Sequence, residues 1–99
     1  MNKTFRINSI TVAEVCKKNN IASLSLFGSY ARGDFTPQSD VDMLVRFSKP
    51  KSLLDLVRVE RELTKHIGKP VDLVTEDAVS PYLKESIKSN LKLIYEQKG

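Results

Sequence analysis

The fold is decided by the stretch GSYARG, residues 28–33, followed by SDVDMLV, residues 39–45. A turn bounded by Gly28 and Gly33 precedes two carboxylates, Asp40 and Asp42, which lie at the start of an apolar strand. Residues two apart in a strand point to the same face, so these carboxylates are expected to lie side by side. Neighbouring carboxylates repel each other, and a hard cation such as Mg²⁺ removes that cost while keeping water or phosphate as further ligands. The pattern therefore predicts a metal site beside a phosphate-binding turn.

The carboxylate pair admits a second interpretation, in which Asp40 and Asp42 form a solvated strand end with an Asx turn. The complete pattern around them favours metal binding. Two metal ions about 3.5–4 Å apart could clamp the attacking and leaving oxygens of a phosphoryl displacement, provided that carboxylates bridge them.

The turn before the carboxylates could hold phosphate. Gly28 lets the backbone approach a phosphate closely, and the exposed N–H groups of a strand-to-helix turn attract anions. The Ser29 hydroxyl could donate a hydrogen bond to a phosphate oxygen, although an ordinary turn would use the same residues. The planar guanidinium of Arg32 could form two parallel hydrogen bonds to phosphate, or Arg32 could instead form a structural ion pair with Asp34 or Asp40. No Gly-Lys-Ser/Thr follows, so this is not a Walker A loop.

The segment from residue 28 to residue 45 resembles the signature of the DNA polymerase β-like nucleotidyltransferases. More narrowly, it is similar to the minimal nucleotidyltransferases, often encoded beside a HEPN-domain partner as toxin–antitoxin modules. The signature is Gly-Ser, then Ala-Arg-Gly, then Ser-Asp-x-Asp-hydrophobic-x-Val. The matching residues are Gly28, Ser29, Ala31, Arg32, Gly33, Ser39, Asp40, Asp42, Leu44 and Val45. The chain length is also that of the minimal members.

The resemblance implies a third acidic residue on a later strand, and Asp72 in PVDLV, residues 70–74, fits that place. By resemblance, Asp72 would be a metal ligand or the base that takes the proton of the acceptor hydroxyl. Asp is also common at the start of a strand for capping reasons, so a structural role is the alternative.

The chain is expected to form an α/β fold in which helices cover a mixed sheet, and the resemblance implies a polymerase β-like core. Ser52 and Asp55 are spaced as a capping box, and Gly68 with Pro70 ends the helix that they begin. Apolar residues at helical spacing predict buried faces: Ile10, Val12, Val15 and Cys16 in the first helix, and Leu53, Leu56, Val57, Leu63 and Ile67 in the helix after Ser52. Helices are predicted over 8–19, 53–67 and 78–89, and a short helix or turn over 29–33. Strands are predicted over 21–27, 41–47 and 71–75, whereas 91–95 fits a strand or a helical turn.

Ninety-nine residues predict a single domain, 1–99, with no room for a second domain to bind a large acceptor. No apolar stretch approaches a membrane span, residues 1–6 lack the long apolar core of a signal peptide, and Cys16 cannot form an internal disulfide. These features indicate the cytoplasm. The net charge of +4 is spread along the chain, so nucleic acid is not an expected partner.

The motif favours a magnesium-dependent nucleotidyltransferase that binds a nucleoside triphosphate. The resemblance implies that ATP donates AMP to a tyrosine of a partner HEPN ribonuclease toxin, which would make this chain an antitoxin and a component of a hetero-oligomer. Two alternatives stay open. A non-catalytic antitoxin would neutralise its partner by binding alone, but it would not need clustered carboxylates. A small-molecule transferase of the aminoglycoside-modifying type normally carries an additional helical domain.

Overall fold

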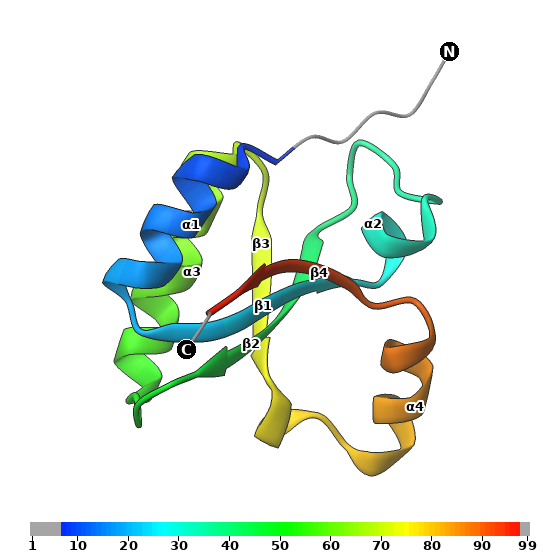
Figure 1. Ribbon diagram of the computed structural model, residues 1–99. Coiled ribbons are helices and arrows are strands. Elements are labelled where there is room, and N and C mark those ends of the chain that lie inside the picture. The colour runs from blue at the N-terminus through cyan, green and yellow to red at the C-terminus, as the bar shows by residue number, and fades with distance from the viewer. Residues whose placement is uncertain (1–6, 98–99) are drawn as a thin grey trace.

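The computed structural model describes residues 7–97, apart from the side chains of Leu83 and Ser86. Its centre is a four-stranded sheet in the order β3-β2-β1-β4 (Figure 1). Strand β1 is antiparallel to both β2 and β4, whereas β2 and β3 are parallel, so the sheet is mixed as the sequence predicted. The strands are β1 (Ile21–Phe27), β2 (Val41–Phe47), β3 (Val71–Thr75) and β4 (Lys92–Glu96), and the helices are α1 (Ser9–Lys18), α2 (Ser29–Arg32), α3 (Leu53–Ile67) and α4 (Pro81–Ser89).

Local signals set the helix ends. The Asn8 side chain caps α1 by accepting hydrogen bonds from the backbone N–H groups of Ile10 and Thr11, both at 3.2 Å. Helix α3 begins with the predicted capping box, in which Ser52 and Asp55 satisfy each other's backbone N–H groups. It ends at Gly68, whose left-handed backbone (φ 81°) is easy for glycine. These two helices therefore have the bounds that their caps predict, within one residue.

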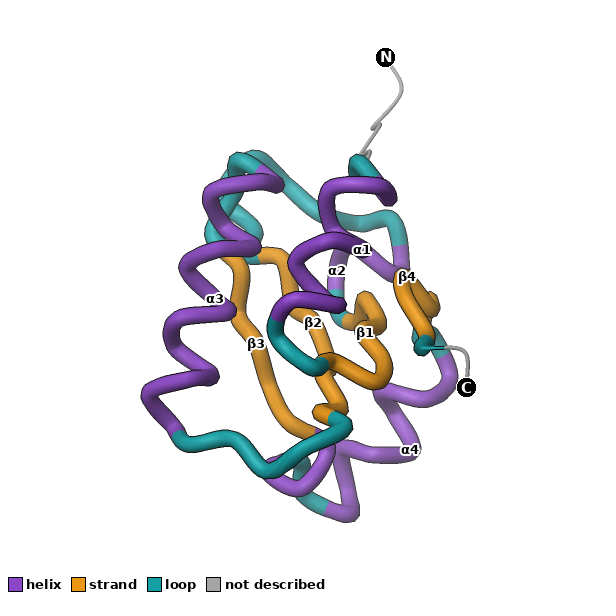
Figure 2. Tube along the Cα trace, turned by 60° about the vertical axis from the view of Figure 1, so that its left-hand side comes forward, coloured by secondary structure: helices purple, strands orange, loops and turns teal. Residues whose placement is uncertain are grey.

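Helices α1 and α3 pack together on one face of the sheet, whereas α4 lies on the other side (Figures 1 and 2). Alternate residues of β2 are buried against α1 and α3, which leaves Asp42, Leu44 and Arg46 on the opposite face. We call that opposite face the open face. The buried cluster between the helices and the sheet includes Val12, Val15, Cys16, Leu24, Met43, Val45, Val59, Leu63 and Leu73.

Helix α3 also protects the outer edge of β3. Its Thr64 hydroxyl accepts a hydrogen bond from the backbone N–H of Val71 at 3.1 Å, and Glu60 Oε2 accepts one from Leu73 at 2.9 Å. An unpaired strand edge is a site for unwanted pairing, so these side chains cap it. They also hold Asp72, the residue between the two donors, at a defined position.

The last third of the chain differs from the sequence prediction. Glu76–Ala78 forms a 3₁₀ turn, and α4 starts only at Pro81, because proline is favoured at the first position of a helix. The undecided segment 91–95 is a strand, β4, shifted by one residue.

Two parts of the predicted apolar helix faces are also wrong. Ile10 is 73% exposed in the first turn of α1, and Leu53 is 77% exposed at the start of α3. Val57 is exposed as well, whereas Val59 is buried in its place. Val12 is buried in the same first turn of α1 that exposes Ile10, so helical spacing alone overstates which apolar residues of a helix are covered.

Candidate functional site

Two of the three candidate carboxylates meet across neighbouring strands. In the parallel pairing of β2 with β3, Asp42 lies directly opposite Asp72. Adjacent strands are about 4.8 Å apart, so the two side chains are neighbours on the open face. Asp40 comes two residues before Asp42, just ahead of the first residue of β2. Asp42 is half-buried, whereas Asp40 and Asp72 are exposed.

The Gly28 turn lies against this pair. Phe27, the last residue of β1, pairs with Asp42, and Gly28 follows as the N-terminal cap of α2. A Cβ atom at Gly28 would come within 3.3 Å of Asp42 Cβ and 3.2 Å of its Cγ, and it would overlap Oδ2. Gly28 also adopts φ 72° and ψ −150°, a region that is essentially restricted to glycine. The turn and the carboxylate can therefore be this close only because residue 28 has no side chain.

The electrostatics couple the three carboxylates. The pKa of Asp42 is raised, first by its burial and then by the negative charges of Asp72 and Asp40, while Arg32 opposes the shift. A carboxylate destabilised in this way is more stable beside a cation. The donors are all carboxylate oxygens, which suit Mg²⁺ with water or phosphate in its remaining positions. Among residues 7–97, no group of three or more His, Cys, Asp and Glu side chains is arranged so that it could hold a metal ion by itself, so a bound ion would need ligands from water or phosphate.

Arg32 forms one of the two ion pairs that the sequence analysis gave as alternatives. Its Nε atom lies 3.2 Å from Asp34 Oδ2, and the two side chains are 50% and 61% exposed. An exposed pair of this kind contributes about 0–1 kcal/mol, so phosphate could displace Asp34 at little cost. The positive charge of Arg32 is also felt at Asp42. The ion pair and the predicted phosphate contact are therefore compatible.

The loop between α2 and β2 is held by contacts that the sequence only partly indicated. Ser39 Oγ accepts a hydrogen bond from the backbone N–H of Thr36 at 2.9 Å, so Ser39 closes the turn before Asp40. The ring of Phe35 stacks on Tyr30, with centroids 4.3 Å apart. Tyr30 is buried and belongs to the hydrophobic core. Phe35 was not predicted, although an aromatic residue in a polar loop is a signal of such an anchor.

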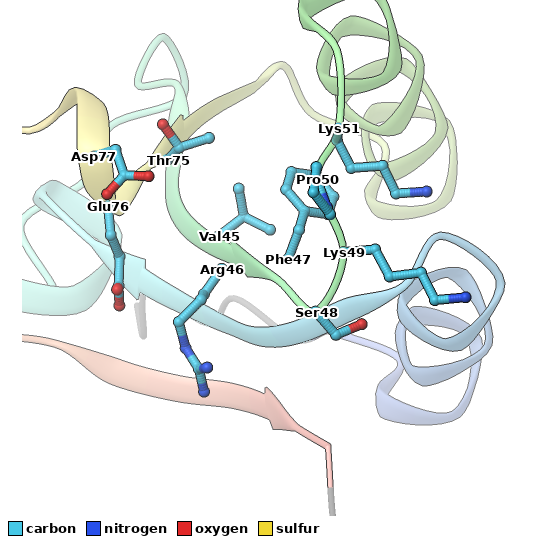
Figure 3. A pocket seen from close by; sticks show the side chains of 10 residues that line it. All are labelled: Val45, Arg46, Phe47, Ser48, Lys49, Pro50, Lys51, Thr75, Glu76 and Asp77. Carbon is cyan, nitrogen blue, oxygen red and sulfur yellow. The ribbon is translucent and has the colours of Figure 1, made fainter.

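The candidate site is an exposed surface and does not coincide with the pockets of the molecule. A pocket of about 570 Å³ lies at the other end of β2 and β3. Figure 3 shows Lys49 and Lys51 on one side of it and Glu76 and Asp77 on the other. A smaller hollow of about 170 Å³ lies between the open face and α4, where it is lined by Leu44, Glu76, Val79, Lys84, Ile87 and Lys88.

The chain belongs to the nucleotidyltransferase domain family, which it matches over residues 9–94. This family membership agrees with the turn, the strand pairing and the carboxylates described above, and it makes the chain a nucleotidyltransferase of the minimal type. None of the helices within residues 7–97 is long and apolar enough to span a membrane.

Among similar sequences, the protein adenylyltransferase MntA of Thermococcus cleftensis is 36% identical over 88 residues, or 86% of this chain and 81% of that protein. A protein of Methanocaldococcus jannaschii, named for the same activity, is 43% identical over 76 residues, or 77% of this chain and 82% of the relative.

Solved structures share the fold. A minimal nucleotidyltransferase is 32% identical with a TM-score of 0.73, and the match covers 84% of this chain and 85% of that one. A toxin–antitoxin complex with AMP-PNP has a TM-score of 0.77 at 21% identity, with coverage of 93% and 76%. A complex of the tri-AMPylated HEPN toxin of Shewanella oneidensis with its MNT antitoxin has a TM-score of 0.68 at 20% identity, with coverage of 91% and 71%.

Proposed function

We propose that this protein is a single-domain, magnesium-dependent enzyme that transfers AMP from ATP to a tyrosine hydroxyl of a HEPN-domain toxin. The modification would silence the toxin, so the chain would act as its antitoxin. The observation that carries the proposal is the position of Asp42, which lies opposite Asp72 on β3 and against the Gly28 turn. The relatives named as adenylyltransferases and the structure of an AMPylated HEPN toxin with an MNT antitoxin support the donor and the partner.

The proposed reaction forms one bond and breaks one. The acceptor oxygen attacks the α-phosphorus of ATP, and the bond from that phosphorus to the oxygen shared with the β-phosphate breaks, releasing pyrophosphate. The hydroxyl proton passes to a carboxylate, for which the exposed Asp72 is the candidate. Asp40, Asp42 and Asp72 would hold Mg²⁺, which supplies charge neutralisation at the phosphate oxygens when bound.

The Gly28 turn would position the triphosphate. The N-terminal end of α2 begins at Ser29, one strand away from Asp42, and its backbone N–H groups favour an anion. The Ser29 hydroxyl and the Arg32 guanidinium would add hydrogen bonds to phosphate oxygens. This placement would hold the α-phosphate beside the carboxylates, so catalysis rests on positioning and charge.

The test mixes the protein with a HEPN-domain protein encoded beside it, ATP and Mg²⁺, and follows both chains by intact mass. We expect one or more AMP increments on the partner and none with Asp42→Asn, which keeps the shape of the side chain but loses its charge. The modified partner should stay inactive after the antitoxin is removed, because a covalent mark survives dissociation. If Asp42→Asn neutralises the partner as well as wild type without a mass change, inhibition occurs by binding and the proposal is wrong.

A further inference from the structure

The hollow between the open face and α4 lies on the same sheet face as the carboxylates. Leu44 follows Asp42 by two residues on β2, so both side chains project from that face. Leu44 pairs with Ser25 on β1 and with Val74 on β3. This row of residues lies two positions further along β2 than the Asp42–Asp72 pair. The hollow therefore lies directly beside the candidate catalytic surface.

The composition of this hollow suits a flat heteroaromatic ring. Leu44, Val79 and Ile87 are partly buried and provide an apolar floor and wall. Glu76, Lys84 and Lys88 also line it and place both an acceptor and donors around that wall. A volume of about 170 Å³ is below the ~300–1,000 Å³ of sites for whole drug-sized ligands, so only a ring-sized part of a ligand would fit.

We propose that this hollow receives the nucleobase of the donor nucleotide, an inference that rests on the proposed function. Two residues along a strand span about 6.6 Å, which is the scale of the ribose that separates an α-phosphate from its base. With the α-phosphate beside Asp42, a base over Leu44 needs no change in the sheet. Glu76 would accept a hydrogen bond from an exocyclic amine, and Lys84 or Lys88 would donate one to a ring nitrogen or carbonyl.

The 570 Å³ pocket is a weaker candidate for the base. It is lined by the last residues of β2, from Val45 to Phe47, together with the loop that follows, so it begins further from Asp42 than Leu44 does. Its lysines and its acidic residues are spread around a wide opening (Figure 3). The smaller hollow is both closer to the carboxylates and better matched to one ring.

The test measures the binding of two probes by titration calorimetry in Mg²⁺: ATP, which has a base, and inorganic tripolyphosphate, which has none. Leu44→Ala and Val79→Ala should weaken ATP binding by roughly tenfold through lost apolar contact, and should leave tripolyphosphate binding unchanged. Leu93→Ala is the matched control, because Leu93 pairs with Ser25 in the same row but is 58% exposed and does not line the hollow. Glu76→Ala, a change at an exposed residue that removes the acceptor, should also weaken the binding of ATP but not of tripolyphosphate, and this test does not depend on the folding of the apolar variants.

The outcomes separate this inference from the proposed function. If the variants bind both probes as wild type does, the nucleobase lies elsewhere and the inference fails, although nucleotide transfer stands. If they bind ATP normally but need more partner protein for half-maximal modification, the hollow holds the acceptor ring and the inference is likewise overturned. If wild type binds neither probe, both the inference and the proposed function are wrong.

Discussion

Gly28 and Asp42 depend on each other. The half-buried carboxylate occupies the space where a side chain at residue 28 would be, and the glycine-restricted backbone of that residue brings the turn to the carboxylate. In the proposed mechanism the same closeness would place phosphate next to the acidic residues. Glycine is thus required here for two separate reasons, one in the backbone and one in space.

This closeness predicts that Gly28→Ala is destabilising and inactive. The backbone conformation alone costs about 1–3 kcal/mol for a residue with a Cβ, and the overlap with Asp42 adds to that. Gly33→Ala is the control: Gly33 also has a positive φ of 87°, but nothing lies within 4 Å of its Cβ position. It should lose roughly 1–2 kcal/mol and keep AMP transfer. Denaturant unfolding and the intact-mass assay measure both effects, and equal losses in the two variants would contradict the argument.

At the same scale, the sequence places Asp42 on a strand more directly than it places Asp72 opposite Asp42 or selects a partner for Arg32. The two-residue period of a strand is a local property, so it predicts that Asp42 faces away from the buried Val41 and Met43. Asp40 lies ahead of the first residue of β2, and its shared face with Asp42 stays a prediction. The position of Asp72 opposite Asp42 depends on the register of a parallel pair with α3 between the strands, which no local pattern determines. The partner of Arg32 was open because two acidic residues were within reach, and the structure selects Asp34.

Among the elements, α1 and α3 are joined by one polar contact beside their apolar packing. Glu62 on α3 accepts hydrogen bonds from Lys18 Nζ at 2.9 Å and from Asn19 Nδ2 at 3.1 Å. Asn19 Nδ2 also donates to the backbone carbonyl of Val15 at 2.8 Å, which ties the end of α1 to the same carboxylate. These bonds lower the pKa of Glu62 from 4.5, with Lys18 as the first cause.

The Glu62 contact predicts a pH-dependent part of the stability. A lowered pKa in the folded state means that Glu62 stabilises the fold above the unfolded value of 4.5, and that this contribution is lost as the pH falls below it. Glu62→Gln should cost roughly 0.5–1 kcal/mol at neutral pH and nothing in acid, because the pair is partly exposed and screened. Asp34→Asn, in the more exposed pair with Arg32, is the control and should have almost no effect. Unfolding curves across this pH range test both variants, and a loss that persists in acid would count against the contact.

The three strands that were predicted correctly each have a glycine or a proline close to one end. Strands β1, β2 and β3 match the predicted bounds because Gly28, Lys49-Pro50 and Pro70 limit them. Helix α4 was predicted to start too early, since the 3₁₀ turn at Glu76–Ala78 has no distinct local signal. Strand β4 was left undecided because five residues of mixed polarity do not separate strand from helix, and only pairing with β1 decides it.

In the molecule as a whole, the two faces of the sheet have different roles. The face against α1 and α3 holds the buried core, whereas the open face carries Asp42, Asp72 and the hollow beside α4. Burial around Asp42 and its acidic neighbours raises the free energy of the ligand-free fold, as its raised pKa indicates. Stability and ligand binding are therefore expected to oppose each other at this residue.

That opposition predicts a crossover in thermal stability. Without ligand, Asp42→Asn should melt at or above the temperature of wild type, because it removes a partly buried charge facing Asp72 and Asp40. With Mg²⁺ and ATP at about a hundred times Kd, wild type should gain about 2.7 kcal/mol, or several degrees, whereas Asp42→Asn should gain much less. Melting curves of both proteins with and without ligand make the comparison, and a chelator should reverse the gain of wild type. A ligand-induced gain of equal size in both proteins would show that Asp42 does not hold the metal, and would remove the three-carboxylate site from the proposal.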